Sequence, residues 1–194
     1  MNKFKAIEVE KCVFFLCDLQ DKFRSHIVSF DVIIKTAKRM IEISDILSVP
    51  LIVTEQYPQG LGKTVSELNI KNAKLLEEKT EFSMLSNKIN CYLEDNKIES
   101  VILMGIEAHV CIFQTCIGLL SKGINVYLLV DGISCRNIND GVIAVKQLQA
   151  MGVILTTSES VIFQLIRNKS HAHFKDVQAL IKEIIPPNEI IKRL

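Results

Sequence analysis

The stretch SVILMGIEAHVCIFQTCIGLLSKGINVYLLVDG, residues 100–132, contains two apolar runs separated by a segment with helical spacing. The runs at 100–105 and 124–132 are short and almost wholly apolar, so each predicts a buried strand. The segment between them, 110–123, predicts a helix that stops at Gly123. Strand, helix and strand in this order indicate one parallel βαβ unit. Turn chemistry alone does not explain why the first run breaks at Gly105 or why Cys111 follows it so soon.

The same alternation continues on both sides of this unit. Further strands are predicted at 12–18, 51–54, the first half of 73–82 and 153–157. Further helices are predicted at 31–47, 83–97, after Asn137 or Asn139 up to 152, 158–166 and 172–185. Asp31 is the predicted N-cap of the first helix, and the capping-box spacing of Thr64 and Glu67 predicts an additional short helix. The segment 55–63 reads as loop from its Pro and Gly content.

The strands are nearly all apolar rather than alternating, which is typical of a parallel sheet covered on both faces. We therefore predict an α/β fold, with a doubly wound, six-stranded, mostly parallel sheet and helices on both faces in three layers. The length of 194 residues predicts a single domain over residues 1–194.

The composition argues against several classes of partner. The net charge is +1, from 23 basic and 22 acidic residues, and no dense basic run is present, so a nucleic-acid partner is not expected. The N-terminal segment resembles neither a signal nor a transit peptide, and no apolar stretch reaches the roughly 18 residues that span a bilayer. We expect a soluble, cytoplasmic protein with no membrane association. In that setting the six cysteines, which lack a CxxC pair, are expected to be reduced thiols, most of them buried.

Five polar residues stand at or just after predicted strand ends, where ligands bind in parallel sheets. They are Asp18, Glu55, Lys79, Cys111 and Asp131. Cys111 would lie in the first turn of a helix, where unpaired N–H groups and the helix dipole favour a thiolate. Asp18 could accept its proton, and Lys79 could hold Asp18 ionised and stabilise nearby negative charge.

Each of these residues also has a structural interpretation. Cys111 could be a small core residue, Asp18 a cap, and Lys79, within the charged segment EEKTEF, a solvated surface residue. His109 is two residues from Cys111 and is poorly placed to pair with it, so we expect its side chain to face solvent. Cys116 is expected in the core, and Cys135 is expected to be partly exposed.

Five motifs, in order along the chain, resemble the isochorismatase-like cysteine hydrolases, in particular the branch of isochorismatase domain-containing proteins. They are FFLCDLQDKF (14–23), LIVTEQYPQGLG (51–62), EKTEFSM (78–84), MGIEAHVC (104–111) and VDGISCRN (130–137). The similarity covers about residues 10 to 165. It implies a catalytic Asp18, Lys79 and Cys111, no cofactor and a homo-oligomer, either a dimer or a tetramer.

The resemblance also implies how the nucleophile is presented. Many members have a non-proline cis peptide before the cysteine, here between Ile106 and Glu107. It would direct the backbone N–H groups of Glu107 and Cys111 at a developing oxyanion. Nicotinamidases of the superfamily bind a metal through an Asp and His residues after the second strand, and TEQYPQGLG contains neither, so no metal is expected. Isochorismatases proper lack the cysteine nucleophile, so the family name does not give the substrate.

The leading functional hypothesis is a metal-independent cysteine hydrolase of a small amide or related C–N compound. A catalytically weak or inactive binding module is the alternative. Nucleic-acid processing is a third, since some relatives carry a ribonuclease label. The residues expected to contact a small-molecule substrate flank the motifs: Phe23, Gln56, Tyr57 and Phe82.

Overall fold

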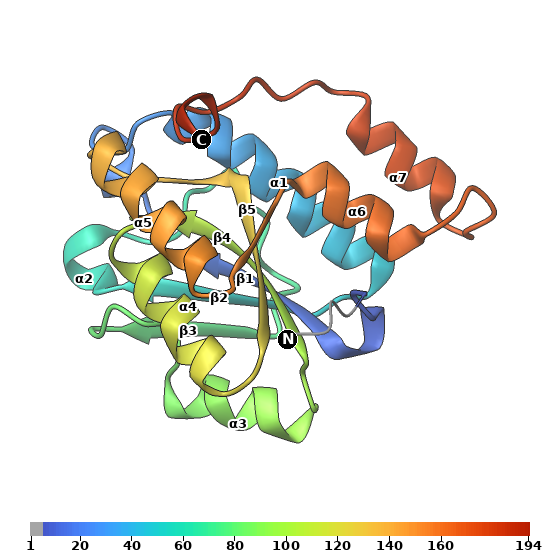
Figure 1. The fold of residues 1–194 in the computed structure, drawn as a ribbon, viewed down its shortest axis with the longest axis horizontal. Coiled ribbons are helices and arrows are strands. Elements are labelled where there is room, and N and C mark those ends of the chain that lie inside the picture. The colour runs from blue at the N-terminus through green and yellow to red at the C-terminus, as the bar shows by residue number, and fades with distance from the viewer. Residues whose placement is uncertain (1–5) are drawn as a thin grey trace.

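The computed structural model describes residues 6–194 and contains a six-stranded sheet (Figure 1). The strands are β1 (Cys12–Cys17), β2 (Leu51–Gln56), β3 (Leu75–Lys79), β4 (Ser100–Ile106), β5 (Asn125–Ser134) and β6 (Ile154–Thr156). Their order is β3-β2-β1-β4-β5-β6, and every neighbouring pair is parallel. The predicted doubly wound α/β fold is confirmed.

Helices cover both faces of the sheet (Figure 1). On one face lie α1 (Phe30–Leu47), α6 (Ser158–Ile166) and α7 (Phe174–Ile181); on the other lie α3 (Asn87–Asp95), α4 (Cys111–Ser121) and α5 (Ile138–Ala150). Short segments complete the chain: α2 (Pro58–Leu61) and the 3-10 turns η1 (Val9–Lys11), η2 (Asp21–Phe23) and η3 (Ile191–Arg193). Because successive strand residues face opposite sides, Phe14 packs with the α1 layer while Phe15 and Cys17 pack with the α4 layer.

The strand order reverses between β1 and β4. The chain runs outward from β1 through β2 to β3, then returns to the other side of β1 as β4. In open parallel sheets, the crevice beyond the carboxyl ends of the strands at such a reversal is where ligands bind. Asp18, which follows β1, and the residues after β4 therefore lie at the expected position of a site.

Gly105 is explained by the close approach of β1 and β4. It pairs with Cys17 in the sheet register and has φ +138°, a conformation that L side chains rarely adopt. A Cβ atom on Gly105 would lie 2.2 Å from the carbonyl oxygen of Cys17 and 2.7 Å from its Cβ. Thus the apolar run is interrupted by glycine because no side chain fits there.

Local helix signals were less reliable than the strand pattern. Helix α1 begins at Phe30 with Ser29 at its N-cap position, so the predicted cap at Asp31 is wrong. Asp31 instead forms an ion pair of 2.9 Å with Arg24. The helix predicted from Thr64 and Glu67 is also wrong.

A buried carboxylate explains this second error. The backbone N–H and the hydroxyl of Thr64 both donate to Glu55 Oε1, at 2.7 and 2.9 Å. Glu67 forms an ion pair with Arg24 instead of a capping box. The short helix α2 lies earlier, at Pro58–Leu61, in the segment predicted to be loop. Tertiary contacts thus replace the local capping pattern.

Five of the six thiols are buried and Cys91 is exposed. The expectation for Cys116 is confirmed, but that of a partly exposed Cys135 is wrong, since its thiol is buried and donates to the carbonyl of Asn137 at 3.0 Å. Burial raises the pKa of Cys116 to about 12. For Cys135, burial is the larger cause and the negative charge of Glu107 the smaller one, and together they raise the pKa to about 11.

The buried thiol of Cys116 should make the protein sensitive to alkaline pH. A raised folded-state pKa contributes stability that is fully present below the unfolded value of 9.0 and is lost as the pH rises toward 12. Between pH 8 and pH 11, that loss amounts to about 2–3 kcal/mol. Between these two pH values, the free energy of unfolding of Cys116→Ala should fall by about 2–3 kcal/mol less than that of wild type. Urea unfolding at both pH values measures the difference. The exposed-site control Cys91→Ala should behave as wild type; an unchanged loss in Cys116→Ala would contradict the prediction.

Candidate active site

The structure brings Asp18, Lys79 and Cys111 together at the carboxyl edge of the sheet. Asp18 follows the last residue of β1, Lys79 is the last residue of β3, and Cys111 is the first residue of α4. All three are buried. Lys79 Nζ lies 2.8 Å from Asp18 Oδ2 and 3.7 Å from Cys111 Sγ. The alternative of a solvated surface lysine is therefore wrong, whereas Cys111 is both a buried residue of the core and a neighbour of Lys79.

The carboxylate of Asp18 is held on both oxygens. The hydroxyl of Thr54, on β2, donates to Oδ1 at 2.8 Å. Oδ2 accepts from Lys79 and, at 3.4 Å, from the thiol of Cys17. A buried carboxylate with these partners keeps one orientation, with its charge balanced by the ammonium group.

Lys79 lies in a cage of acceptors. Its Nζ donates to Gln56 Oε1 at 2.6 Å and to the carbonyl oxygens of Glu81 and Phe82 at 3.1 and 3.0 Å. Burial alone would lower the pKa of Lys79, but the electrostatic interactions of its ammonium group with Cys17, Asp18 and Cys111 outweigh burial and raise it. The lysine is therefore an ammonium ion at neutral pH, beside both the carboxylate and the nucleophile candidate.

Cys111 occupies the positive end of α4. The N-cap residue, Val110, supplies no side-chain acceptor for the first-turn N–H groups of α4. The helix start is fixed by Thr115, whose hydroxyl donates to the carbonyl of Cys111 at 2.7 Å and accepts from the N–H of Met84 at 3.0 Å. A helix N-terminus together with an ammonium group is the environment in which thiolates form.

The backbone at the site differs from the expectation in one respect. No cis peptide bond occurs in residues 6–194, so the cis bond expected between Ile106 and Glu107 is wrong for this structure. The chain instead turns through left-handed residues directly after three strands: Asp18 (φ 55°), Tyr57 (φ 35°) and Glu107 (φ 55°). Non-glycine residues in this conformation are uncommon and cluster at functional sites. The oxyanion role of the Glu107 and Cys111 N–H groups stays a prediction.

The expectation that the His109 side chain faces solvent is wrong. Its side chain is only 20% exposed, and Nδ1 lies 3.5 Å from Glu107 Oε2. On the other side of Glu107, Arg136 Nε lies 3.5 Å from Oε1. The sequence reasoning missed this cluster, although all three residues fall within the MGIEAHVC and VDGISCRN motifs. It also missed Thr54 and the thiol of Cys17.

Of the four residues expected to contact a substrate, two bind Lys79 Nζ: Gln56 through its side chain and Phe82 through its carbonyl oxygen. Tyr57 and Phe82 are exposed, at 54% and 56%, and Phe23 is partly buried against the core beneath α1. Gln56 uses its amide oxygen for Lys79 and its amide nitrogen for the carbonyl of Thr80, at 2.8 Å. Contact between these residues and a substrate stays a prediction.

Three potential metal ligands meet at the same point. One ligand atom each from Cys17, Asp18 and Cys111 lies within 4.8 Å of the others. Lys79 Nζ already provides positive charge at two of these ligands, Asp18 Oδ2 and Cys111 Sγ. A thiophilic divalent ion would have to displace this ammonium group, so the donor set fits a bound metal poorly.

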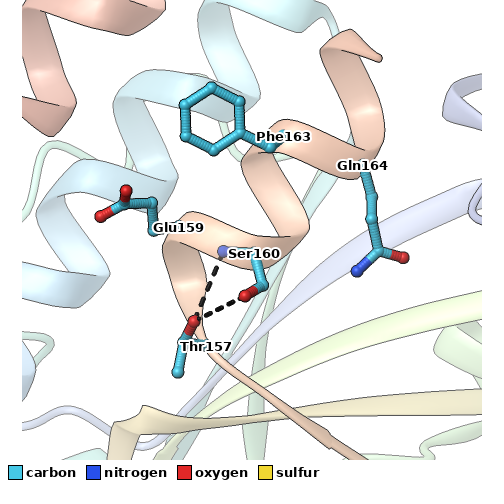
Figure 2. A pocket seen from close by; sticks show the side chains of 5 residues that line it. All are labelled: Thr157, Glu159, Ser160, Phe163 and Gln164. Atoms are coloured by element: carbon cyan, nitrogen blue, oxygen red, sulfur yellow. Dashed lines mark hydrogen bonds between the residues drawn. The ribbon is translucent and has the colours of Figure 1, made fainter.

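A hollow of about 590 Å³ lies against the first turns of α6 (Figure 2). Thr157 and Ser160 hydrogen-bond to each other there, while Phe163 and Gln164 extend from the same helix in different directions. The residues that line this hollow come directly after the edge strand β6 in the chain, and none of them is a Cys, His or Lys. It contains no nucleophile and base of the kind found at Cys111.

The comparisons with known proteins identify the family of this chain. The isochorismatase domain matches residues 12–160, which include all the candidate catalytic residues. The chain belongs to the isochorismatase family. It is 41% identical over 183 residues to isochorismatase domain-containing protein 1 from Danio rerio, covering 94% of this chain but 65% of that relative. The chain thus spans slightly less than two thirds of that protein's length.

Solved structures of similar proteins have the same fold. A structure named MAR1 ribonuclease from Caenorhabditis elegans superposes with a TM-score of 0.91 at 44% identity, covering 95% of this chain and 96% of that one. The Escherichia coli YcaC protein, described as an octameric hydrolase of unknown specificity, gives 0.81 at 17% identity, covering 94% and 97%. At that identity the YcaC likeness shows the fold alone. Within residues 6–194, no helix combines the length and apolarity needed to cross a bilayer.

Proposed function

We propose that this isochorismatase-family protein is a metal-independent cysteine hydrolase that cleaves small amides or related C–N compounds. The observation that carries the proposal is the position of one ammonium group, Lys79 Nζ, between the carboxylate of Asp18 and the sulfur of Cys111. A nucleophile, a base and a fixed positive charge are the minimum set for covalent acyl transfer.

The proposed reaction begins with transfer of the Cys111 thiol proton to Asp18. The thiolate then attacks the carbonyl carbon, and the developing oxyanion accepts hydrogen bonds from the backbone N–H groups of Glu107 and Cys111. Asp18 passes the proton to the leaving nitrogen, so that an amine departs and a thioester remains. Asp18 next takes a proton from water, which attacks the thioester and releases the acid. Return of that proton to the sulfur restores the resting thiol.

A ribonuclease is the second candidate, because the similar Caenorhabditis elegans structure bears that name. Two features of this chain argue against it: a net charge of +1, and a Lys79 ammonium already bonded to protein acceptors rather than free for phosphate. Filter binding to single-stranded RNA at low salt distinguishes the two. Tight binding that weakens steeply with added salt would favour the ribonuclease.

We also infer a homo-oligomer, with a dimer or tetramer as the expected form. Exposed aromatic rings at Tyr57 and Phe82 offer apolar surface beside the site, and the distant YcaC protein is described as octameric. Sedimentation equilibrium would measure the assembly size. A monomer at micromolar concentration would contradict this inference without affecting the chemistry.

Alkylation tests the nucleophile without knowledge of the substrate. We expect iodoacetamide at pH 7 to label Cys111 at least about ten times faster than Cys91, because Asp18 can accept the thiol proton and Lys79 Nζ, 3.7 Å from the sulfur, stabilises the negative charge that develops there. Cys91 is a stringent reference, because it is exposed to the reagent whereas Cys111 is buried. Rates are read by mass spectrometry of the two peptides, with Cys111→Ser as the control for assignment.

Faster labelling of the exposed Cys91 would show that Cys111 is not activated. Turnover itself is tested with a panel of small amides, followed by a search for an acyl adduct on the Cys111 peptide. Release of amine by wild type and by Cys111→Ser at the same rate would contradict the hydrolase proposal.

A further inference from the structure

Cys17 is a second thiol at the nucleophile, and the proposed hydrolysis makes no use of it. It is the last residue of β1 and is completely buried. Its sulfur lies within 4.8 Å of Cys111 Sγ and 3.4 Å from Asp18 Oδ2. Two other buried thiols donate to backbone carbonyls elsewhere: Cys12 to that of Val9 and Cys135 to that of Asn137.

The two neighbouring sulfurs have different environments. Burial, and after it the hydrogen bond with Cys111, hold the pKa of Cys17 well above its ordinary value. Cys17 therefore stays a neutral thiol, while Cys111 lies at a helix N-terminus beside an ammonium group. A nucleophilic sulfur next to a protonated one is the arrangement of a peroxide-reactive cysteine with its resolving thiol.

We propose that hydroperoxides convert this pair into a Cys17–Cys111 disulfide, which reversibly blocks the nucleophile. The Cys111 thiolate attacks the peroxide O–O bond, so its sulfur is oxidised to a sulfenic acid while the distal oxygen leaves and is protonated to water or an alcohol. Cys17 then attacks the sulfenic sulfur. Its proton goes to Asp18, 3.4 Å away, and from there to the departing hydroxide, which leaves as water. Two thiols and one hydroperoxide thus yield one disulfide, one water and one alcohol, or two waters from hydrogen peroxide.

Formation of the bond requires a modest local movement. The sulfurs must close from at most 4.8 Å to about 2 Å. Cys17 is fixed between two neighbouring strands inside the sheet, whereas Cys111 is the first residue of its helix, so the rotation is expected at Cys111. The pairing also protects the nucleophile, because a sulfenic acid without a partner thiol proceeds to irreversible sulfinic and sulfonic acids.

The test exposes the full chain to hydrogen peroxide at neutral pH, blocks the remaining thiols and maps the peptides by mass spectrometry. Wild type should yield a cross-linked pair of peptides containing Cys17 and Cys111, and a thiol reductant should restore alkylation of Cys111. The Cys17→Ser variant keeps a hydrogen-bond donor for Asp18, but its Cys111 should be oxidised to the sulfinic state. After reduction, the alkylation of Cys111 recovered in this variant should be about ten-fold lower than in wild type, or lower still. Cys17→Ala repeats the test should the hydroxyl disturb the site.

Cys116→Ala is the matched control, because Cys116 is a buried thiol on the same helix as Cys111. This variant should form the disulfide as wild type does. Equal irreversible oxidation in wild type and in both Cys17 variants would overturn the proposal, as would a disulfide with another partner. The readout is the mass of the thiols, so a failure of the hydrolase proposal, seen as absent amide turnover, is recognised separately.

Discussion

Replacing Lys79 by methionine is expected to slow alkylation of Cys111 by about 100-fold and to lower the free energy of unfolding by about 3–5 kcal/mol. Methionine matches the length of the lysine stem but has no charge. The variant removes the positive charge that lies 2.8 Å from Asp18 Oδ2 and 3.7 Å from Cys111 Sγ. Asp18 would keep its donors Thr54 and Cys17 but would be a buried, unpaired carboxylate.

A double-mutant cycle separates these two effects. Asp18→Asn alone leaves the ammonium group without its carboxylate and should also destabilise the fold. In the double variant Asp18→Asn/Lys79→Met no unpaired charge remains, so most of the lost stability should return while reactivity of Cys111 stays low. Stability is measured by urea unfolding and reactivity by iodoacetamide. Simple addition of the two single losses would show that the pair is not coupled and would remove the physical basis of the site.

The position of this pair could be predicted from the sequence because it follows from topology. Apolar runs mark the strands, parallel strands share one carboxyl edge, and so Asp18, Lys79 and Cys111 were expected at the same edge. The strand pattern was informative because whole runs of Val, Ile, Leu and Phe have few alternative structures. The third strand is not such a run: it was predicted by its position in the chain, in the first half of 73–82, and the observed strand Leu75–Lys79 lies slightly later.

What the sequence could not provide was the set of contacts across the chain. Thr54 reaches Asp18 from a neighbouring strand, and Gln56 reaches Lys79 over a separation of 23 residues. Such pairs depend on strand register and side-chain rotamers, which no single-sequence pattern encodes. The wrong helix at Thr64 has the same origin, because the buried carboxylate of Glu55 accepts from the Thr64 N–H, which Glu67 would bind in a capping box, and also from the Thr64 hydroxyl.

Gly105→Ala is expected to lower the free energy of unfolding by about 4 kcal/mol or more, or to prevent folding. The added methyl group would lie 2.2 Å from the carbonyl oxygen of Cys17, which belongs to the central strand and cannot move without breaking the register of β1 with β4. The φ of +138° adds backbone strain for any residue with a Cβ.

Gly123→Ala is the matched control. Gly123 also has a positive φ, +74°, but nothing lies within 4 Å of a Cβ built there, so backbone strain is the whole cost and about 1 kcal/mol is expected. Comparison of the two urea unfolding curves isolates the contribution of the strand contact. Equal losses in the two variants would mean that β1 and β4 can move apart at Gly105 without cost.

The contact between Gly105 and Cys17 also holds Cys17 and Asp18 beside the turn that leads to Cys111. A folded Gly105→Ala protein should therefore show slower alkylation of Cys111, whereas Gly123→Ala should not.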